Sequence, residues 1–417
     1  MESKERSCIQ LTESGAKEKA FRFLNLSVPV LMGIFIFLNP FPYTTAIKEI
    51  CFYSAIAIVL LLAGFKKIEF SFQSPLTLPF ILFTLWAFIG LFFALDKENS
   101  IHDFQTHLLK YLVFYYILIN VFATRERLGY LAWVIMLSSA LVSTGLIVNF
   151  YGIQGHSLST RLVTGIPEIA VNGLGIIAVP ASIFALYQLM TQKRLFMKAA
   201  SLACLFPSVM ICFLTHARAT LLAIFLASII LFFKNKKFLL ACMGIILIFA
   251  VMTPIKDRFA STDPSNKLRL ASYYINYEVI KDYPILGMGF GMETFGNRKF
   301  IDLDAYYNRI PEEYRVGILA DPHSMLFSVA VRTGLVGLVL FLFILFMPFR
   351  ITWGLIRQGK GDGGDSWGRS LLSAWAAVLI IGFFEPFFNH FSEVVFYTLL
   401  AMITSYWKFS DNRMSQL

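Results

Sequence analysis

One stretch of the sequence concentrates the side chains that could do chemistry. It is the polar interval 254–324, which separates two long apolar runs and ends in the segment 320–324 (ADPHS). Imidazole titrates near neutral pH, so His323 could remove a proton from a hydroxyl group. A single histidine beside an apolar run is more often an amphipathic anchor, so its role depends on its neighbours.

Arginine is the second residue type that the sequence places where chemistry is possible. Arg269 and Arg315 lie in this interval, Arg161 lies in a short connection, Arg218 lies at the start of an apolar run, and Arg332 lies nine residues into the helix that follows His323. A planar guanidinium holds phosphate oxygens through two parallel hydrogen bonds, so a cluster of them predicts a pyrophosphate site. The alternative for each arginine is to reach lipid headgroups or to pair with a carboxylate such as Glu168, Glu385 or Glu393.

Metal and nucleotide sites are not favoured by the remaining motifs. The glycines of 287–291 resemble a phosphate-binding loop, but no strand precedes them and a structural turn is favoured. The Asp-Leu-Asp triplet 302–304 matches a metal-binding spacing that is too short to be specific. His102 and His107 are five residues apart, which suits a shared ligand site on a helix poorly. We expect no metal and no cofactor.

The composition of the chain indicates what kind of structure positions these side chains. The chain has 417 residues, of which 57% are hydrophobic and only 15% charged, and this is too apolar for a soluble protein. We therefore expect one integral membrane domain, 1–417, with no separate soluble domain. The net charge of +10 does not indicate nucleic acid, because the basic residues follow the pattern of a membrane topology signal.

The apolar pattern predicts an all-α polytopic membrane protein with about twelve transmembrane helices. The predicted spans are 24–40, 46–64, 76–95, 108–122, 127–151, 169–190, 198–215, 218–233, 237–253, 325–347, 370–388 and 391–408. With the basic tail 1–22 inside, every cytoplasmic connection is basic. Both termini are then cytoplasmic, and 254–324 becomes a large periplasmic loop between helices 9 and 10.

The periplasmic loop is expected to contain one amphipathic helix. Leu270, Tyr273, Tyr277 and Ile280 recur at helical spacing, which predicts a helix over 267–281 lying on the bilayer or on the bundle. This helix should end before the proline at 284. A flexible glycine turn is expected to follow it.

Three features together resemble the O-antigen ligase and polymerase family of bacterial envelope enzymes. They are Arg218 at the start of an apolar run, Arg269 leading into 281–291, and 323–324 followed by 332–337. The resemblance covers the carboxyl-terminal half in detail and the whole chain in helix layout. In this family a glycan passes from an undecaprenyl pyrophosphate carrier to an acceptor without a metal.

The resemblance also implies roles for individual residues. Arg218 and Arg269 would hold the pyrophosphate, His323 would activate the acceptor hydroxyl, and Arg161 would be a further family arginine. The family often has asparagine where this chain has Ser324. We include Arg315 and Arg332 among the predicted substrate-binding residues, although the family often has an acidic or polar residue at the position of Arg332.

The resulting functional expectation is a glycosyltransferase of the bacterial inner membrane. It would join O-antigen to lipid A-core at the periplasmic face, with inversion because one displacement suffices. An O-antigen polymerase, which would use the same donor, stays open because loop shape selects the acceptor. A transporter is the distant alternative, since the carboxylates lie near predicted helix ends and no internal repeat is visible.

Overall fold

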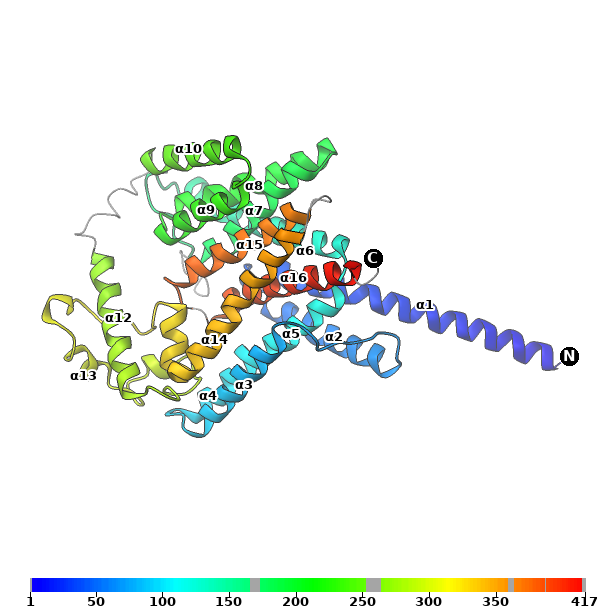
Figure 1. The fold of residues 1–417 in the computed structure, drawn as a ribbon, viewed down its shortest axis with the longest axis horizontal. Coiled ribbons are helices and arrows are strands. Elements are labelled where there is room, and N and C mark those ends of the chain that lie inside the picture. The colour runs from blue at the N-terminus through cyan, green and yellow to red at the C-terminus, as the bar shows by residue number, and fades with distance from the viewer. Residues whose placement is uncertain (1, 166–172, 253–263, 359–363, 387, 415–417) are drawn as a thin grey trace.

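A computed structural model describes residues 2–165, 173–252, 264–358, 364–386 and 388–414 (Figure 1). Within these residues the secondary structure is helical and contains no strand. The amino-terminal helix projects from one end of the bundle, and the helices of the long polar interval lie at the opposite end (Figure 1). Glu168 and residues 254–263, which entered the sequence predictions, lie outside the described residues.

The helices follow the apolar pattern closely. Their bounds are α1 (Glu2–Phe37), α2 (Thr45–Gly64), α3 (Thr77–Phe92), α4 (Lys97–Asp103), α5 (Lys110–Val121), α6 (Arg125–Ile147), α7 (Leu174–Thr191), α8 (Leu195–Leu214), α9 (Arg218–Phe232), α10 (Lys236–Met252), α12 (Pro264–Asp282), α13 (Leu303–Tyr307), α14 (Met325–Gln358), α15 (Gly364–Gly382) and α16 (His390–Met414). Two π-helical turns, Phe104–Leu109 and Val148–Ile153, precede α5 and follow α6.

Six of these helices are long and apolar enough to cross a membrane by length and composition, within the part of the chain that is described. They lie in α1, α2, α6, α7, α8 and α14, while α3, α9 and part of α15 form shorter apolar helices. The predicted all-α membrane class is thus confirmed, and a helix occupies each of the twelve predicted intervals. The count of twelve spans and the periplasmic side of 254–324 stay predictions.

Local sequence sets where several helices begin. The Asp96 carboxylate accepts a hydrogen bond from the backbone N–H of Asn99 at 3.1 Å and so caps α4. The Thr124 hydroxyl caps α6 by accepting a hydrogen bond from the backbone N–H of Arg127 at 3.3 Å. The predicted amphipathic helix is present as α12, and it ends two residues before Pro284 as expected.

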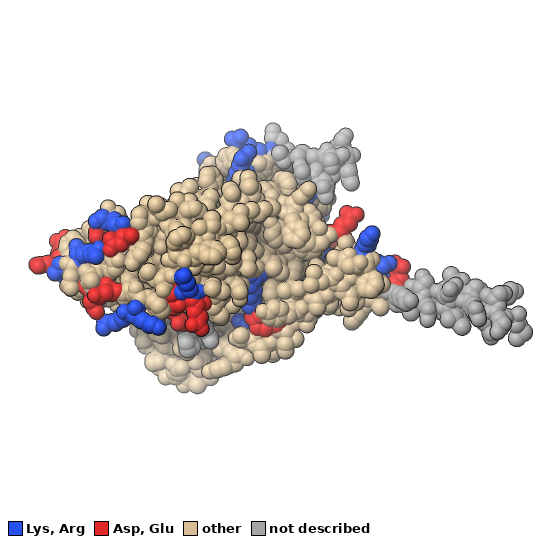
Figure 2. All heavy atoms as spheres, turned by 90° about the horizontal axis from the view of Figure 1, so that it is seen from below, with Lys and Arg blue, Asp and Glu red and all other residues tan. Residues whose placement is uncertain are grey.

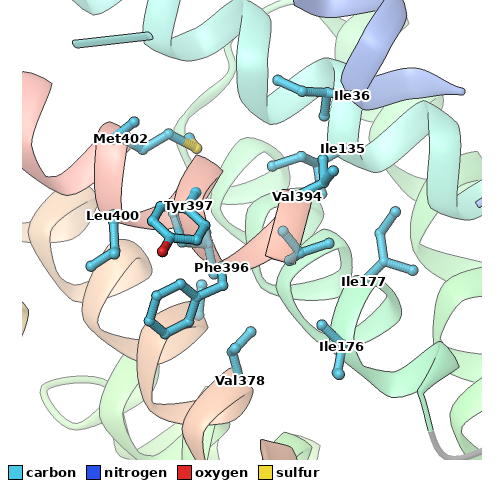
Figure 3. Close-up of a cluster of buried hydrophobic side chains, with 14 of the residues drawn as sticks. Ile36, Ile135, Ile176, Ile177, Val378, Val394, Phe396, Tyr397, Leu400 and Met402 are labelled. Atoms are coloured by element: carbon cyan, nitrogen blue, oxygen red, sulfur yellow. The ribbon is translucent and has the colours of Figure 1, made fainter. Parts of the chain in front are cut away.

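The centre of the bundle is a dense apolar core around α16 (Figure 3). Side chains from α1, α6, α7 and α15 meet those of α16, among them Ile36, Ile135, Ile177, Val378 and Phe396. Trp375 of α15 is fully buried, and its indole N–H donates to the Leu345 carbonyl at 3.2 Å. Because lipid tails are as apolar as these side chains, packing and such hydrogen bonds hold the helices together.

On the face that Figure 2 shows, charged side chains lie mainly at the edges and in a few small groups, and most of the surface is uncharged. Large apolar side chains such as Leu60, Leu85 and Phe206 are exposed on the described molecule. A soluble protein would rarely expose so continuous an apolar surface. This distribution fits the membrane setting that the helix pattern predicts.

The helix α14 has a sharp kink at Gly334, where φ is +70° and ψ is −177°. Backbone hydrogen bonds with residues 284–289 hold this kink. The kink frees the N–H of Leu335, which donates to the Pro284 carbonyl at 2.8 Å. The Met288 N–H donates to the Val331 carbonyl at 2.9 Å. The expectation of a flexible turn here was wrong, because these contacts fix the glycine segment against α14.

We expect Gly334→Ala to lower the free energy of unfolding by about 2–4 kcal/mol. A Cβ at this position would overlap the Ile285 carbonyl, and the left-handed φ disfavours any side chain. Gly354→Ala on the same helix is the matched control, because a Cβ there has no neighbour within 4 Å. Thermal unfolding of the purified variants tests this, and equal unfolding midpoints would contradict it.

Candidate functional site

His323 is held in a strained position just before α14. Its φ is +47°, which is unusual for a residue other than glycine and often marks a functional site. The preceding Pro322 carbonyl accepts a hydrogen bond at 2.9 Å from the amide of Asn276, which is buried on α12. This bond fixes the backbone beside His323 and leaves the imidazole half-buried at the mouth of α14.

The surroundings of His323 keep its imidazole neutral. Burial lowers its pKa below the ordinary value of 6.5, and the positive charge of Arg269 lowers it further. The carboxylate of Asp321 acts in the opposite direction, but burial is the larger effect. A neutral imidazole at neutral pH can accept a proton, as a general base must.

Arg269 faces inward from α12 and meets a buried carboxylate. Its Nη2 atom lies 3.7 Å from Oε1 of Glu385, whose side chain is 5% exposed. Tyr273 lies one turn along α12, and its pKa is raised by burial and is sensitive to the charges of both Arg269 and Glu385. We call these residues, together with Asp321 and His323, the Arg269 cluster. Pairing with Glu385 is the structural alternative that the sequence left open for this arginine.

Arg161 and Arg218 lie on adjoining segments. The Nε atom of Arg161 donates to the Thr215 carbonyl at 2.9 Å, three residues before Arg218. The next residue, Leu162, donates its backbone N–H to the Leu214 carbonyl at 2.9 Å. The loop that carries Arg161 therefore runs along the turn that leads into α9.

Arg218 lies at the same end of the bundle as the Arg269 cluster. Trp367, near the start of α15, contacts Tyr187 near the end of α7 with ring centroids 4.8 Å apart, so these helices are antiparallel. Gly175 in the first turn of α7 packs directly on Thr220 in the first turn of α9. The start of α9 is therefore level with the end of α15, which leads into the partner of Arg269.

A comparison with known families finds a match to this chain. Residues 200–342 match a family model described as O-Antigen ligase. This match supports a relationship to the O-antigen ligase family for residues 200–342, which we call the O-antigen ligase segment. No curated protein matches the chain. That family is related to glycosyl transfer, and it implies lipid-linked glycan substrates and a membrane setting.

The O-antigen ligase segment contains four of the five predicted arginines and His323, while Arg161 lies ahead of it. Arg315 donates to the carbonyls of Ile310 at 3.0 Å and Asn308 at 2.7 Å. These bonds close the loop on which it lies. A role for Arg315 in substrate binding stays a prediction.

Arg332 is buried in the O-antigen ligase segment and is 3% exposed. Its guanidinium donates to the Met292 carbonyl at 3.3 Å and to Ser328, and it lies 5.6 Å from the ring centre of Phe388. This arginine thus ties the glycine segment to α14 and to the connection before α16. Direct contact with a substrate is not supported by this geometry, and that role stays a prediction.

An apolar groove of about 830 Å³ opens between α12 and α14 beside the Arg269 cluster. It reaches from Ser324, next to His323, to Phe383 and Phe384, next to Glu385. Tyr273 and Phe327, whose ring centroids are 5.2 Å apart, form part of its wall. The apolar groove therefore lies directly beside the polar cluster and shares Tyr273 with it.

Sequence reasoning missed Asn276, which orients the segment before His323. The sequence does place Asn276 on the same helical face as Arg269, Tyr273 and Ile280, and this spacing could have indicated its burial. A fully buried amide needs a hydrogen-bond partner. Asn276 was overlooked because the partner is a backbone carbonyl of a distant loop, which has no signature in the sequence.

Proposed function

We propose that this protein is an O-antigen ligase of the bacterial inner membrane. It transfers O-antigen from undecaprenyl pyrophosphate to lipid A-core at the periplasmic face. The observation that carries the proposal is the Arg269 cluster, which combines a guanidinium and a neutral imidazole inside the family segment. The position of Arg218 at the same end of the bundle adds a second cation.

The two arginines serve the donor in this proposal. Arg269, which is 26% exposed, exchanges Glu385 for an oxygen of the pyrophosphate, and Arg218 binds the same group. As the bond between the anomeric carbon and the phosphate oxygen breaks, negative charge grows on the leaving diphosphate. The guanidiniums stabilise that charge more in the transition state than in the bound donor.

His323 serves the acceptor. Its neutral imidazole takes the proton of the lipid A-core hydroxyl as the oxygen attacks the anomeric carbon. One new glycosidic bond forms, one bond to phosphate breaks, and undecaprenyl pyrophosphate leaves. A single displacement inverts the anomeric centre. No residue in this scheme needs a metal or cofactor.

The apolar groove between α12 and α14 suits the prenyl chain of the donor. Its lining is almost wholly apolar, and it lies beside the cluster that contains Arg269, one of the two cations that would hold the headgroup. A polyprenyl pyrophosphate has this combination, with a charged head joined to a long hydrocarbon tail. The groove therefore supports a lipid-linked donor rather than a nucleotide sugar.

The decisive test incubates purified protein with undecaprenyl-pyrophosphate-linked O-antigen and lipid A-core in the presence of chelator. We expect polysaccharide to appear on lipid A-core. Lengthening of the lipid-linked glycan without transfer to lipid A-core would instead establish the polymerase. In a deletion strain, loss of all attached O-antigen indicates the ligase, whereas one attached repeat unit indicates the polymerase.

The pH dependence of transfer provides a separate prediction. Because the neutral form of His323 is active and its pKa is lowered from 6.5, activity should fall only below pH 6.5 on the acidic side. Asp321→Asn removes the charge that raises this pKa, so its acidic limb should move to lower pH. Asp304→Asn, an exposed residue of the same loop, is the control. An acidic limb that moves upward in Asp321→Asn would contradict the assignment.

A further inference from the structure

A second cavity, of about 430 Å³, has a lining that shares no residue with the Arg269 cluster. The connection between α1 and α2 covers it, and α5 and α16 form its walls. Met292 and Phe388, which contact Arg332, also line it. Its polar residues are not used in the transfer that we propose.

Two histidines and a glutamate meet at the wall of this cavity. His107 lies in the π-helical turn before α5, a rare local geometry that is frequent at functional sites. Its Nδ1 atom is 2.7 Å from Oε2 of Glu393 on α16. His390, one turn before Glu393, places its own Nδ1 atom 3.8 Å from the same oxygen. The two imidazole rings are stacked with centroids 4.3 Å apart.

The carboxylate of Glu393 is only half satisfied. Its side chain is 0% exposed, and its Oε1 atom has no hydrogen-bond partner among the described residues. A buried carboxylate oxygen without a donor costs free energy, because water has been removed and nothing replaces it. The Oε1 atom of Glu393 can therefore accept a cation as its partner.

We propose that His107, His390 and Glu393 bind a divalent transition-metal ion of the zinc class. Two imidazoles and one carboxylate are a donor set that zinc accepts, with a fourth position open to the cavity. The ligand atoms already lie within 4.8 Å of one another. Metal–ligand bonds of about 2.0–2.2 Å place the ligand atoms of a tetrahedral site roughly 3.4 Å apart. The His107–Glu393 pair must therefore open from 2.7 Å, and His390 must approach Glu393 from 3.8 Å.

A small side-chain movement achieves that approach. The side chain of His390 is 54% exposed and lies at the first residue of α16, so its ring can turn out of the stack toward Glu393. This turn breaks the hydrogen bond between the Nδ1 atom of His390 and the Tyr111 hydroxyl, 3.1 Å away, and the Nδ1 atom binds the metal in its place. The bound ion joins α16 to the start of α5 and stabilises that contact.

Zinc binding by untagged, chelator-treated full-length protein tests the proposal. Calorimetric titration with Zn²⁺ should show one equivalent for the unmodified protein and for His102→Ala, a neighbouring histidine that is 68% exposed. His107→Ala and Glu393→Gln should weaken binding at least about 100-fold. Substitution with Co²⁺ should give the visible absorption of a four-coordinate site.

This test does not depend on the proposed glycan transfer, because it measures metal binding and thermal unfolding. Zn²⁺ should raise the unfolding midpoint of the unmodified protein and leave that of Glu393→Gln unchanged. If a buried variant fails to fold, His390→Ala at the half-exposed position replaces it. Absence of Zn²⁺ binding to the unmodified protein, or equal binding by the folded variants, would show that the trio is only a hydrogen-bonded cluster.

Discussion

Replacement of His323 with alanine is expected to lower the rate of glycan transfer by about 10²–10⁴-fold, the range that a positioned general base contributes. In the Arg269 cluster the imidazole of His323 is neutral at neutral pH and can accept a proton, because its pKa is lowered from 6.5. Without it, the acceptor hydroxyl must attack while it still holds its proton. Initial rates with purified protein, lipid-linked donor and lipid A-core measure the loss.

A second substitution separates chemistry from backbone strain at this position. Asparagine tolerates the left-handed φ of +47° better than alanine does, but its amide cannot act as a base. His323→Asn should therefore fold at least as well as His323→Ala and transfer equally slowly. His156→Ala, at an exposed histidine, should keep the full rate. Normal transfer by His323→Asn would remove the histidine from the mechanism.

The helical layout could be predicted because membrane helices are encoded locally. About twenty apolar residues between polar connections define a span without reference to the rest of the chain, and each predicted interval contains a helix. The amphipathic face of α12 is local as well, since Tyr273, Ile280 and their neighbours recur at helical spacing. Within the described residues six helices meet the length and composition of a span, and α9, at 15 residues, is shorter, so the count of twelve spans stays a prediction.

The contacts that build the sites could not be predicted, because they join residues that are far apart in the sequence. Arg269 meets Glu385, and His107 meets Glu393 across 286 positions. The spacing of His102 and His107 was judged within one helix, whereas the partners of His107 lie on α16. A residue type indicates what a side chain can bind, but only the packing of distant helices determines what it does bind.

Replacement of Arg269 with alanine is expected to lower transfer by about 10²–10³-fold, the usual effect of removing one donor that stabilises transition-state charge. Arg269→Lys should recover little, because an ammonium cannot make the two parallel hydrogen bonds that a guanidinium makes to phosphate. Arg298→Ala is the matched control, since that arginine is 80% exposed and pairs with Asp304. The measurement is kcat and KM for the donor.

Glu385→Gln distinguishes a phosphate-binding role of Arg269 from a purely structural one. If Arg269 serves only to neutralise Glu385 at 3.7 Å, removing either charge should destabilise the protein similarly and affect transfer alike. If Arg269 binds the diphosphate, Glu385→Gln leaves the guanidinium available and should reduce transfer far less than Arg269→Ala. A larger loss of kcat in Arg269→Ala, with equal thermal stability of the two variants, would place the arginine on the leaving group, because only a transition-state interaction lowers kcat in this way.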